Sequence, residues 1–172
     1  MSNALLVSFG VVVIVTAVLG AVAWQRPGRQ HGQGFTLALQ QLKAMGPRVL
    51  LGILAASFIA ELLPKDIVAE LAGADSGWQG ILLATLIGAS VPTGPMVLFP
   101  VAVALLEVGV GVPQIVAFVT SWGLLAVHRL IVWEIPLMGV NFVAVRLAAS
   151  ILFPPLSGFA AGWLMLMLGI VS

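Results

Sequence analysis

Residues 80–106 read GILLATLIGASVPTGPMVLFPVAVALL, a run of 27 residues without a charged side chain. A continuous helix of that length would extend about 40 Å, whereas the hydrocarbon core of a bilayer is about 30 Å thick. The run is interrupted by SVPTGP at residues 90–95, where Pro92 and Pro95 each remove a backbone donor and Gly94 adds backbone freedom. We therefore expect two half-helices, 80–90 and 96–106, that meet at an unwound loop inside a membrane.

The composition of the whole chain excludes an ordinary soluble domain. Of the 172 residues, 61% are hydrophobic and 8% are charged, and the mean hydropathy is +1.19. A soluble domain carries roughly 25% charged residues. Backbone groups in lipid need partners within the protein, which leaves helix bundles and closed barrels, and the long apolar runs favour helices. The net charge of +1 gives no indication of nucleic-acid binding, and the absence of cysteine excludes disulfides and thiolate metal sites.

We expect an all-α protein: a polytopic transmembrane helical bundle with four crossings and a broken or re-entrant third segment, in a single domain over residues 1–172. The expected helices are 4–24, 49–63, the half-helices 80–90 and 96–106, 113–133 and 146–171. The apolar run 4–24 exceeds the core of a signal peptide, about 7–15 residues, so we interpret it as a retained helix. Residues 135–145 are expected to form a short interfacial element, and Pro154 with Pro155 to kink the last helix.

The two polar loops differ in charge. Residues 25–48 hold four of the seven basic side chains and no acid, which predicts a cytoplasmic loop by the positive-inside rule, with 36–45 as an amphipathic helix on the membrane surface. Residues 64–78 carry one Lys and three acids, a net charge of −2, which fits the exterior. The opposite charges of the two loops predict a multi-pass protein of the cell inner (plasma) membrane with both termini outside. A hairpin at 80–106 would put Arg129 on the cytoplasmic side and a crossing would put it outside; the charge bias favours the hairpin.

The break at residues 90–95 is the strongest candidate for a functional site. Irregular backbone at membrane depth survives where it is buried in protein or lines a polar cavity, and transporters use such half-helices to bind solutes. The candidate solute-binding residues are Ser90, Pro92, Thr93, Gly94 and Pro95. The alternative is a proline-kinked helix whose freed backbone groups are satisfied by neighbouring helices.

Other polar residues within apolar segments are secondary candidates. Thr120 and Ser121 either face the broken segment or serve a helix–helix contact. Glu61, His128 and Glu134 are candidates for a proton or ion relay, against the alternative that they lie at helix ends near water. Arg129 and Trp133 are four residues apart, a spacing that permits a cation–π contact and interfacial anchoring.

Motifs of the common enzyme classes are missing. The sequence has no HExxH, no GxSxG and no pair of intramembrane aspartates, and Gly109-Val110-Gly111 lacks the lysine of a phosphate-binding loop. We expect neither an enzyme nor a cofactor.

Residues 88–121 resemble a repeat unit of the bacterial predicted-permease family that includes the organoarsenical efflux permeases. The resemblance rests on the following residues: Gly88, Pro92, Gly94, Pro95, Leu105-Leu106, Gly109, Ala117-Phe118 and Thr120-Ser121, with Arg146-Leu147-Ala148 and Gly158 further on. It covers about half of the chain and implies transport of a solute.

The chain departs from this family in two ways. Family members are about twice as long and carry the signature in two halves, whereas this sequence has it once. Where the better-known members have cysteines beside the break, this chain has Ser90 and Thr93. Because trivalent arsenic prefers thiolates, the resemblance does not supply the substrate.

Together these features predict a permease subunit of the lipid bilayer that moves a small solute or ion through the broken segment, with two copies assembling as a homodimer and no nucleic acid bound. The alternative is a non-transporting accessory or scaffold membrane protein whose break is a packing kink.

Cysteine labelling tests the expected topology. In intact cells, an impermeant thiol reagent should label Ala74→Cys and leave Gln33→Cys unlabelled, because the basic loop is retained in the cytoplasm. Labelling of Gln33→Cys from outside would overturn the assignment of both loops.

Overall fold

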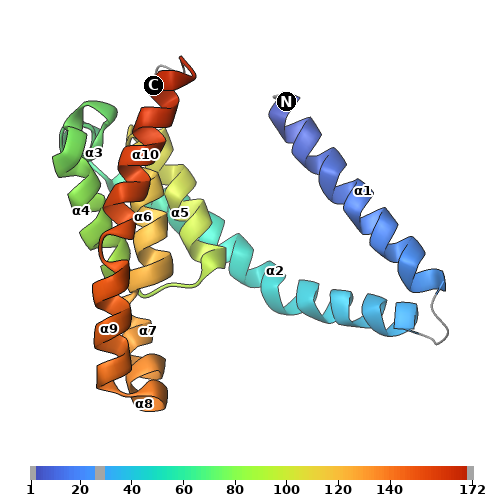
Figure 1. Cartoon of the computed structure of the whole chain (residues 1–172). Coiled ribbons are helices and arrows are strands. Elements are labelled where there is room, and N and C mark those ends of the chain that lie inside the picture. Colours follow the sequence, from blue (N-terminus) through green and yellow to red (C-terminus); the bar gives the residue numbers. More distant parts are fainter. Residues whose placement is uncertain (1–2, 26–29, 170–172) are drawn as a thin grey trace. The chain divides into compact units, whose positions relative to one another are not determined.

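The computed structural model describes residues 3–25 and 30–169, and throughout these ranges the chain forms helices and turns without a strand (Figure 1). The expected all-α helical bundle is confirmed. The elements are α1 (Asn3–Gln25), α2 (Gln30–Leu62), α3 (Lys65–Ala72), η1 (Ala74–Ser76), α4 (Gly77–Ser90), α5 (Pro95–Glu107), α6 (Val112–Leu125), α7 (Val127–Arg129), the π-helical turn η2 (Leu130–Glu134), α8 (Ile135–Met138), α9 (Val140–Ser150) and α10 (Phe153–Met167).

Four segments of the described chain are long and apolar enough to cross a membrane: Leu6–Gln25, Gly32–Leu62, Val112–Met138 and Val140–Met167. Their side chains are mostly exposed, including α1, none of whose spanning residues is buried. Helices that are apolar on all sides and exposed need lipid or another apolar partner around them. This fits a multi-pass membrane protein.

The chain divides into two compact units, Met1–Pro47 and Arg48–Ser172. The first unit contains α1 and the first part of α2, and Arg26 and Arg29 of the expected basic loop lie outside the described residues. The second unit contains the remainder of α2, all later helices and the hydrophobic core, in which Leu98 and Phe118 are almost fully buried.

The two expected half-helices are α4 and α5, and they form a hairpin (Figure 1). The outer ends of the hairpin are tied together, because the Gly111 N–H after α5 donates to the Ala72 carbonyl before α4, at 3.0 Å. The Gln114 amide in α6 reinforces this end by donating to the Gly73 carbonyl at 2.9 Å and to the Ser76 hydroxyl at 3.0 Å. We call this the α3 end of the hairpin, and we call residues 91–94, which join α4 to α5, its tip.

Helix α6 is the centre of the second unit and packs most extensively against α4 and α10. Small residues permit these contacts: Gly88 of α4 lies directly on the Phe118 carbonyl of α6, and a Cβ at Gly158 of α10 would come within 2.9 Å of the Pro113 carbonyl oxygen. At these glycines the backbones of α4 and α6, and of α10 and α6, come into direct contact, as is common in membrane bundles.

Three helices differ in their bounds from the expected ones. Helix α2 starts at Gln30 rather than at residue 49, because residues 30–46 are rich in helix-forming Gln, Leu and Ala and Pro47 is accommodated within the helix. The expected helix 113–133 is interrupted at Ala126, where α6 ends. The expected helix 146–171 begins earlier, at Val140, and is interrupted at residues 151–152; residues 170 and 171 lie outside the described range.

Pro154 and Pro155 open α10 instead of kinking its interior. The first turn of a helix tolerates proline because its N–H groups have no intrahelical partner. The expected interfacial element 135–145 consists of α8 and the first half of α9.

The substitution Gly88→Ala should destabilise the second unit by about 1–3 kcal/mol, because the added methyl group collides with the Phe118 backbone. Thermal unfolding in detergent measures this. Gly123→Ala in α6 is the matched control, since nothing lies within 4 Å of a Cβ at that position. Equal stability of the two variants would contradict the close α4–α6 contact.

Candidate functional site

The tip of the hairpin is an unwound segment in ordinary backbone conformations. Val91 ends α4 with φ −72° and ψ 112°, and Gly94 precedes α5 with φ −90° and ψ 167°. Because Gly94 has a negative φ, glycine is not required there for conformational reasons. No atom lies within 4 Å of a Cβ at Gly94, so this position faces open space.

The tip leaves backbone groups without partners. Val91 N–H donates to the Ile87 carbonyl at 3.2 Å and Thr93 N–H to the Val91 carbonyl at 3.1 Å, whereas Pro92 and Pro95 have no N–H. Among the described residues, no hydrogen bond satisfies the N–H of Gly94 or Met96. Such groups are costly in an apolar medium and available to a polar ligand.

The two hydroxyls of the broken segment differ in their surroundings. The Ser90 hydroxyl donates to the Leu86 carbonyl of its own helix at 2.9 Å, so its hydrogen-bonding capacity is partly used locally. The half-buried Thr93 hydroxyl has no hydrogen-bond partner in the described part of the chain. Thr93 is therefore the better candidate to bind a solute.

Trp122 of α6 holds the tip in place. Its indole Nε1–H donates to the Thr93 carbonyl at 2.9 Å. The bond joins the unwound tip to the last turn of α6, only four residues before α6 itself is interrupted at Ala126. Two helix discontinuities thus lie side by side.

Arg129 of α7 satisfies the end of α6. Its Nη2 donates to the Trp122 carbonyl at 3.1 Å and to the Gly123 carbonyl, two groups that the interruption at Ala126 leaves without helical partners. The guanidinium also lies over the Trp122 ring, 5.6 Å from its centroid. The cation–π partner is therefore Trp122 and not Trp133, which is 63% exposed. The four-residue spacing correctly predicted Arg129 as the cation but predicted the wrong aromatic ring.

The remaining charged candidates are not brought together as a relay. Glu134 in η2 pairs with Arg146 of α9 at 2.8 Å, whereas Glu61 is exposed in the last turn of α2 beside α3. His128 is half-buried, and its Nδ1 has no hydrogen-bond partner among the described residues. The structure thus separates Glu61 from His128 and Glu134.

Thr120 and Ser121 serve helix contacts. The fully buried Ser121 hydroxyl donates to the Thr85 carbonyl of α4 at 2.5 Å, and the Ser157 hydroxyl of α10 donates to Thr120 at 3.1 Å. These bonds fix α4 and α10 on α6 near the level of Trp122, and they correspond to the helix-contact alternative for both residues.

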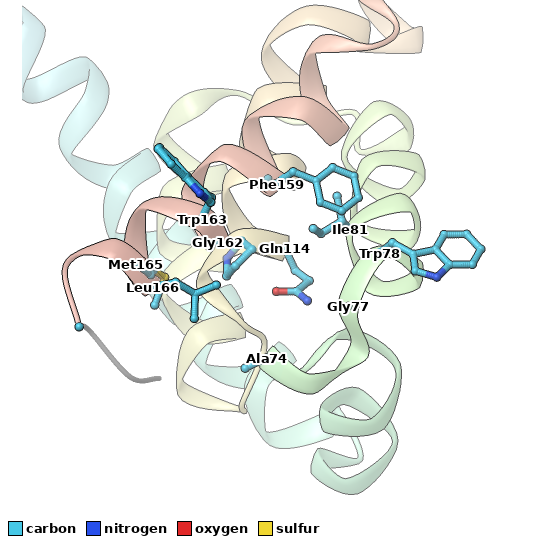
Figure 2. Close-up of a pocket in the computed structure, with 13 residues that line it drawn as sticks. Ala74, Gly77, Trp78, Ile81, Gln114, Phe159, Gly162, Trp163, Met165 and Leu166 are labelled. Carbon is cyan, nitrogen blue, oxygen red and sulfur yellow. The ribbon is translucent and has the colours of Figure 1, made fainter.

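A pocket of about 500 Å³ lies at the α3 end, between α4, α6 and α10. Figure 2 shows Phe159 and Trp163 of α10 and Trp78 of α4 around it, with the buried Gln114 amide near its centre. No residue of the predicted site lines this pocket. Within the described ranges, no three His, Cys, Asp or Glu side chains converge to hold a metal ion.

Comparison of the chain with protein-family models, with curated proteins and with solved structures finds no match.

Two functional candidates escaped the sequence reasoning. Trp122 was not singled out, although an indole N–H beside the pair Thr120-Ser121 in an uncharged helix is a donor that needs a partner. The capping role of Arg129 depends on the interruption at Ala126, which no proline or glycine at that position signals.

The substitution Trp122→Phe should loosen the tip, because it removes the donor to the Thr93 carbonyl and keeps an aromatic ring beneath Arg129. A net hydrogen bond contributes about 0.5–1.5 kcal/mol, so exchange of the hydrogen-bonded amides of Val91, Thr93, Val97 and Leu98 should accelerate roughly three- to tenfold. Hydrogen–deuterium exchange with mass spectrometry measures this. Trp163→Phe, on the exposed face of α10, is the control that should leave these residues unchanged.

Proposed function

We propose that the chain is a subunit of a membrane permease and that the tip of the α4–α5 hairpin contributes to its solute-binding site. The observation that carries the proposal is the combination, at one point, of unpaired backbone N–H groups, a free Thr93 hydroxyl and open space at Gly94. Polar backbone of this kind inside an apolar bundle has a physical reason to persist if a solute or water occupies it. The resemblance of residues 88–121 to a permease repeat supports the same function.

The orientation and the assembly belong to the same proposal. The acid-free basic segment 25–48 supports a cytoplasmic location for that segment, in the inner (plasma) membrane, with both chain termini outside. The exposed residues Pro92 and Gly94 of the tip, with Pro95 at the start of α5, support a second copy as the partner that completes the walls of the site. A homodimer would also supply the second copy of the motif that related permeases carry in one chain.

A non-transporting accessory or scaffold protein is the second candidate, and two hydrogen bonds favour it. Ser90 bonds to its own helix and Trp122 bonds to the Thr93 carbonyl, which are ways to stabilise a packing kink. The two candidate functions differ in the role of the Thr93 hydroxyl. In a permease it binds the solute, whereas in a scaffold protein with a packing kink it has no function.

Thr93→Val distinguishes the two functions. It keeps the shape of the side chain and removes one hydroxyl, so for a bound solute the affinity should fall roughly three- to tenfold, with stability little changed. Ser90→Ala is the matched control and should leave transport unchanged, since the Ser90 hydroxyl is bonded within α4. Solute uptake by proteoliposomes, measured over a range of solute concentrations, gives both values.

Gly94→Leu supplies the stronger test at the same site. A leucine fits the backbone conformation of Gly94 and extends into the open space, so the protein should fold and lose transport. Transport at the original rate in both Thr93→Val and Gly94→Leu would exclude the tip as the site and leave the scaffold function.

Native mass spectrometry in mild detergent and in nanodiscs tests the assembly. We expect a dimer, because the described part of one chain presents a single exposed hairpin tip. A monomer under every lipid and detergent condition would exclude the proposed homodimer.

A further inference from the structure

The charged side chains of the second unit are segregated along the hairpin. At the α3 end lie one cation and five acids: Lys65, Glu61, Asp66, Glu70, Asp75 and Glu107. The tip and the helices beyond it hold three cations and one acid: Arg48, Arg129, Arg146 and Glu134. Since Glu134 pairs with Arg146, no acid among the described residues of the tip side compensates the charges of Arg48 and Arg129.

Arg129 is connected to the tip through Trp122. The guanidinium lies 5.6 Å from the centroid of the ring whose Nε1 is 2.9 Å from the Thr93 carbonyl oxygen. No acid pairs with Arg129 in the described ranges, and its Nε is buried without a hydrogen-bond partner. A positive charge within an apolar span is costly and usually faces a polar pathway.

Arg48 approaches the tip from α2. A Cβ at Gly52 would be 2.8 Å from the Met96 carbonyl oxygen and 3.3 Å from the Val97 Cα, so α2 crosses the first turn of α5 at Gly52. Arg48 lies one turn before Gly52 on the same face of α2, roughly 6 Å along the helix axis. Arg48 is exposed and forms no ion pair among the described residues.

The hydrogen bonds around the tip also bear on the charge of a ligand. The carbonyl end of an interrupted helix is a usual ligand for Na⁺, but the carbonyls of Trp122 and Gly123 are occupied by Arg129 and the Thr93 carbonyl by Trp122. The Thr93 hydroxyl and the N–H of Gly94 remain available as donors. The carbonyls of Ala89, Ser90 and Pro92 have no partner among the described residues, so a cation would not lack acceptors there. It would, however, meet the positive charges of Arg129 and Arg48, which favour an anion at the Thr93 and Gly94 donors.

We propose that the hairpin tip accepts a small anion with oxygen acceptors, such as a carboxylate or an oxyanion, and that Arg129 and Arg48 determine this charge preference. The inference rests on the proposed function and names its substrate class. Arg129 and Arg48 act through their electrostatic field on the site that Thr93 and Gly94 form.

Trp122 allows this preference to be measured without transport. In a variant with Trp24, Trp78, Trp133 and Trp163 changed to Phe, all tryptophan fluorescence comes from beside the tip. Quenching by iodide and by caesium, each normalised to free tryptophanamide at equal ionic strength, reports the local concentration of anions and cations. We expect iodide to be more effective by roughly three- to tenfold, given Arg129 on the ring and Arg48 one turn from the contact of α2 with α5.

Arg129→Gln and Arg48→Gln should each lower the iodide-to-caesium ratio, and together they should bring it close to one. Lys65→Gln removes a cation at the α3 end and should leave the ratio unchanged. Quenching by neutral acrylamide separates charge from structure, because loosening of the tip raises all three constants and leaves the ratio constant. If Arg129→Gln fails to fold, Arg48→Gln still tests the proposal, since its side chain is exposed.

A ratio at or below one in the parent protein, or a ratio that neither substitution lowers, would overturn the anion site. Uptake of radiolabelled acetate and phosphate by proteoliposomes is measured in parallel. A high ratio with uptake that depends on Arg129 supports both proposals. A high iodide-to-caesium ratio without any uptake supports the anion site and contradicts the permease function. Failure of the anion site and failure of the permease function therefore give different results.

Discussion

The need to satisfy backbone N–H and C=O groups inside an apolar bundle determines the arrangement of the second unit. Wherever a helix is interrupted, carbonyls lose their hydrogen-bond partners. A carbonyl that finds no new partner in an apolar medium costs several kcal/mol of stability. The two interruptions beside each other, at the hairpin tip and at Ala126, meet part of this need jointly: one indole bonds the Thr93 carbonyl, and one guanidinium bonds the end of α6 while it stacks on that indole. Trp122 and Arg129 thus connect the hairpin tip with the interruption of α6 at Ala126.

This arrangement also explains where function can reside. Residues with satisfied hydrogen bonds, such as Ser121 on the Thr85 carbonyl, contribute to packing. The tip is one place with unused hydrogen-bonding capacity, because the Thr93 hydroxyl and the Gly94 N–H have no partner among the described residues and neither residue is buried. The pocket at the α3 end differs from the tip in that the Nε2 of its central Gln114 amide is committed to the turn before α4, while the buried Oε1 has no partner among the described residues.

The sequence predicted those parts of the fold that depend on the residues of one segment alone. The prolines at 92 and 95 remove donors whatever surrounds them, so the break and both half-helices could be placed within three residues. The charge-poor runs likewise indicated the spanning helices. The interruption at Ala126 could not be predicted, because alanine is the best helix former and the break is stabilised by a cation three residues later and by tertiary contacts. For the site, proximity in sequence paired Arg129 with Trp133, whereas the interruption redirects the guanidinium to Trp122.

The ion pair between Glu134 and Arg146 has a consequence for biosynthesis. The two residues are on separate helical arms, η2 and α9, joined through α8 and Gly139. A charge alone within a bilayer is costly, and pairing Glu134 with Arg146 lowers that cost for both residues. A nascent chain that ends before Arg146 offers Glu134 to lipid without its counter-ion. The two arms are therefore expected to leave the translocon together, as one helical hairpin, after the second arm has been synthesised.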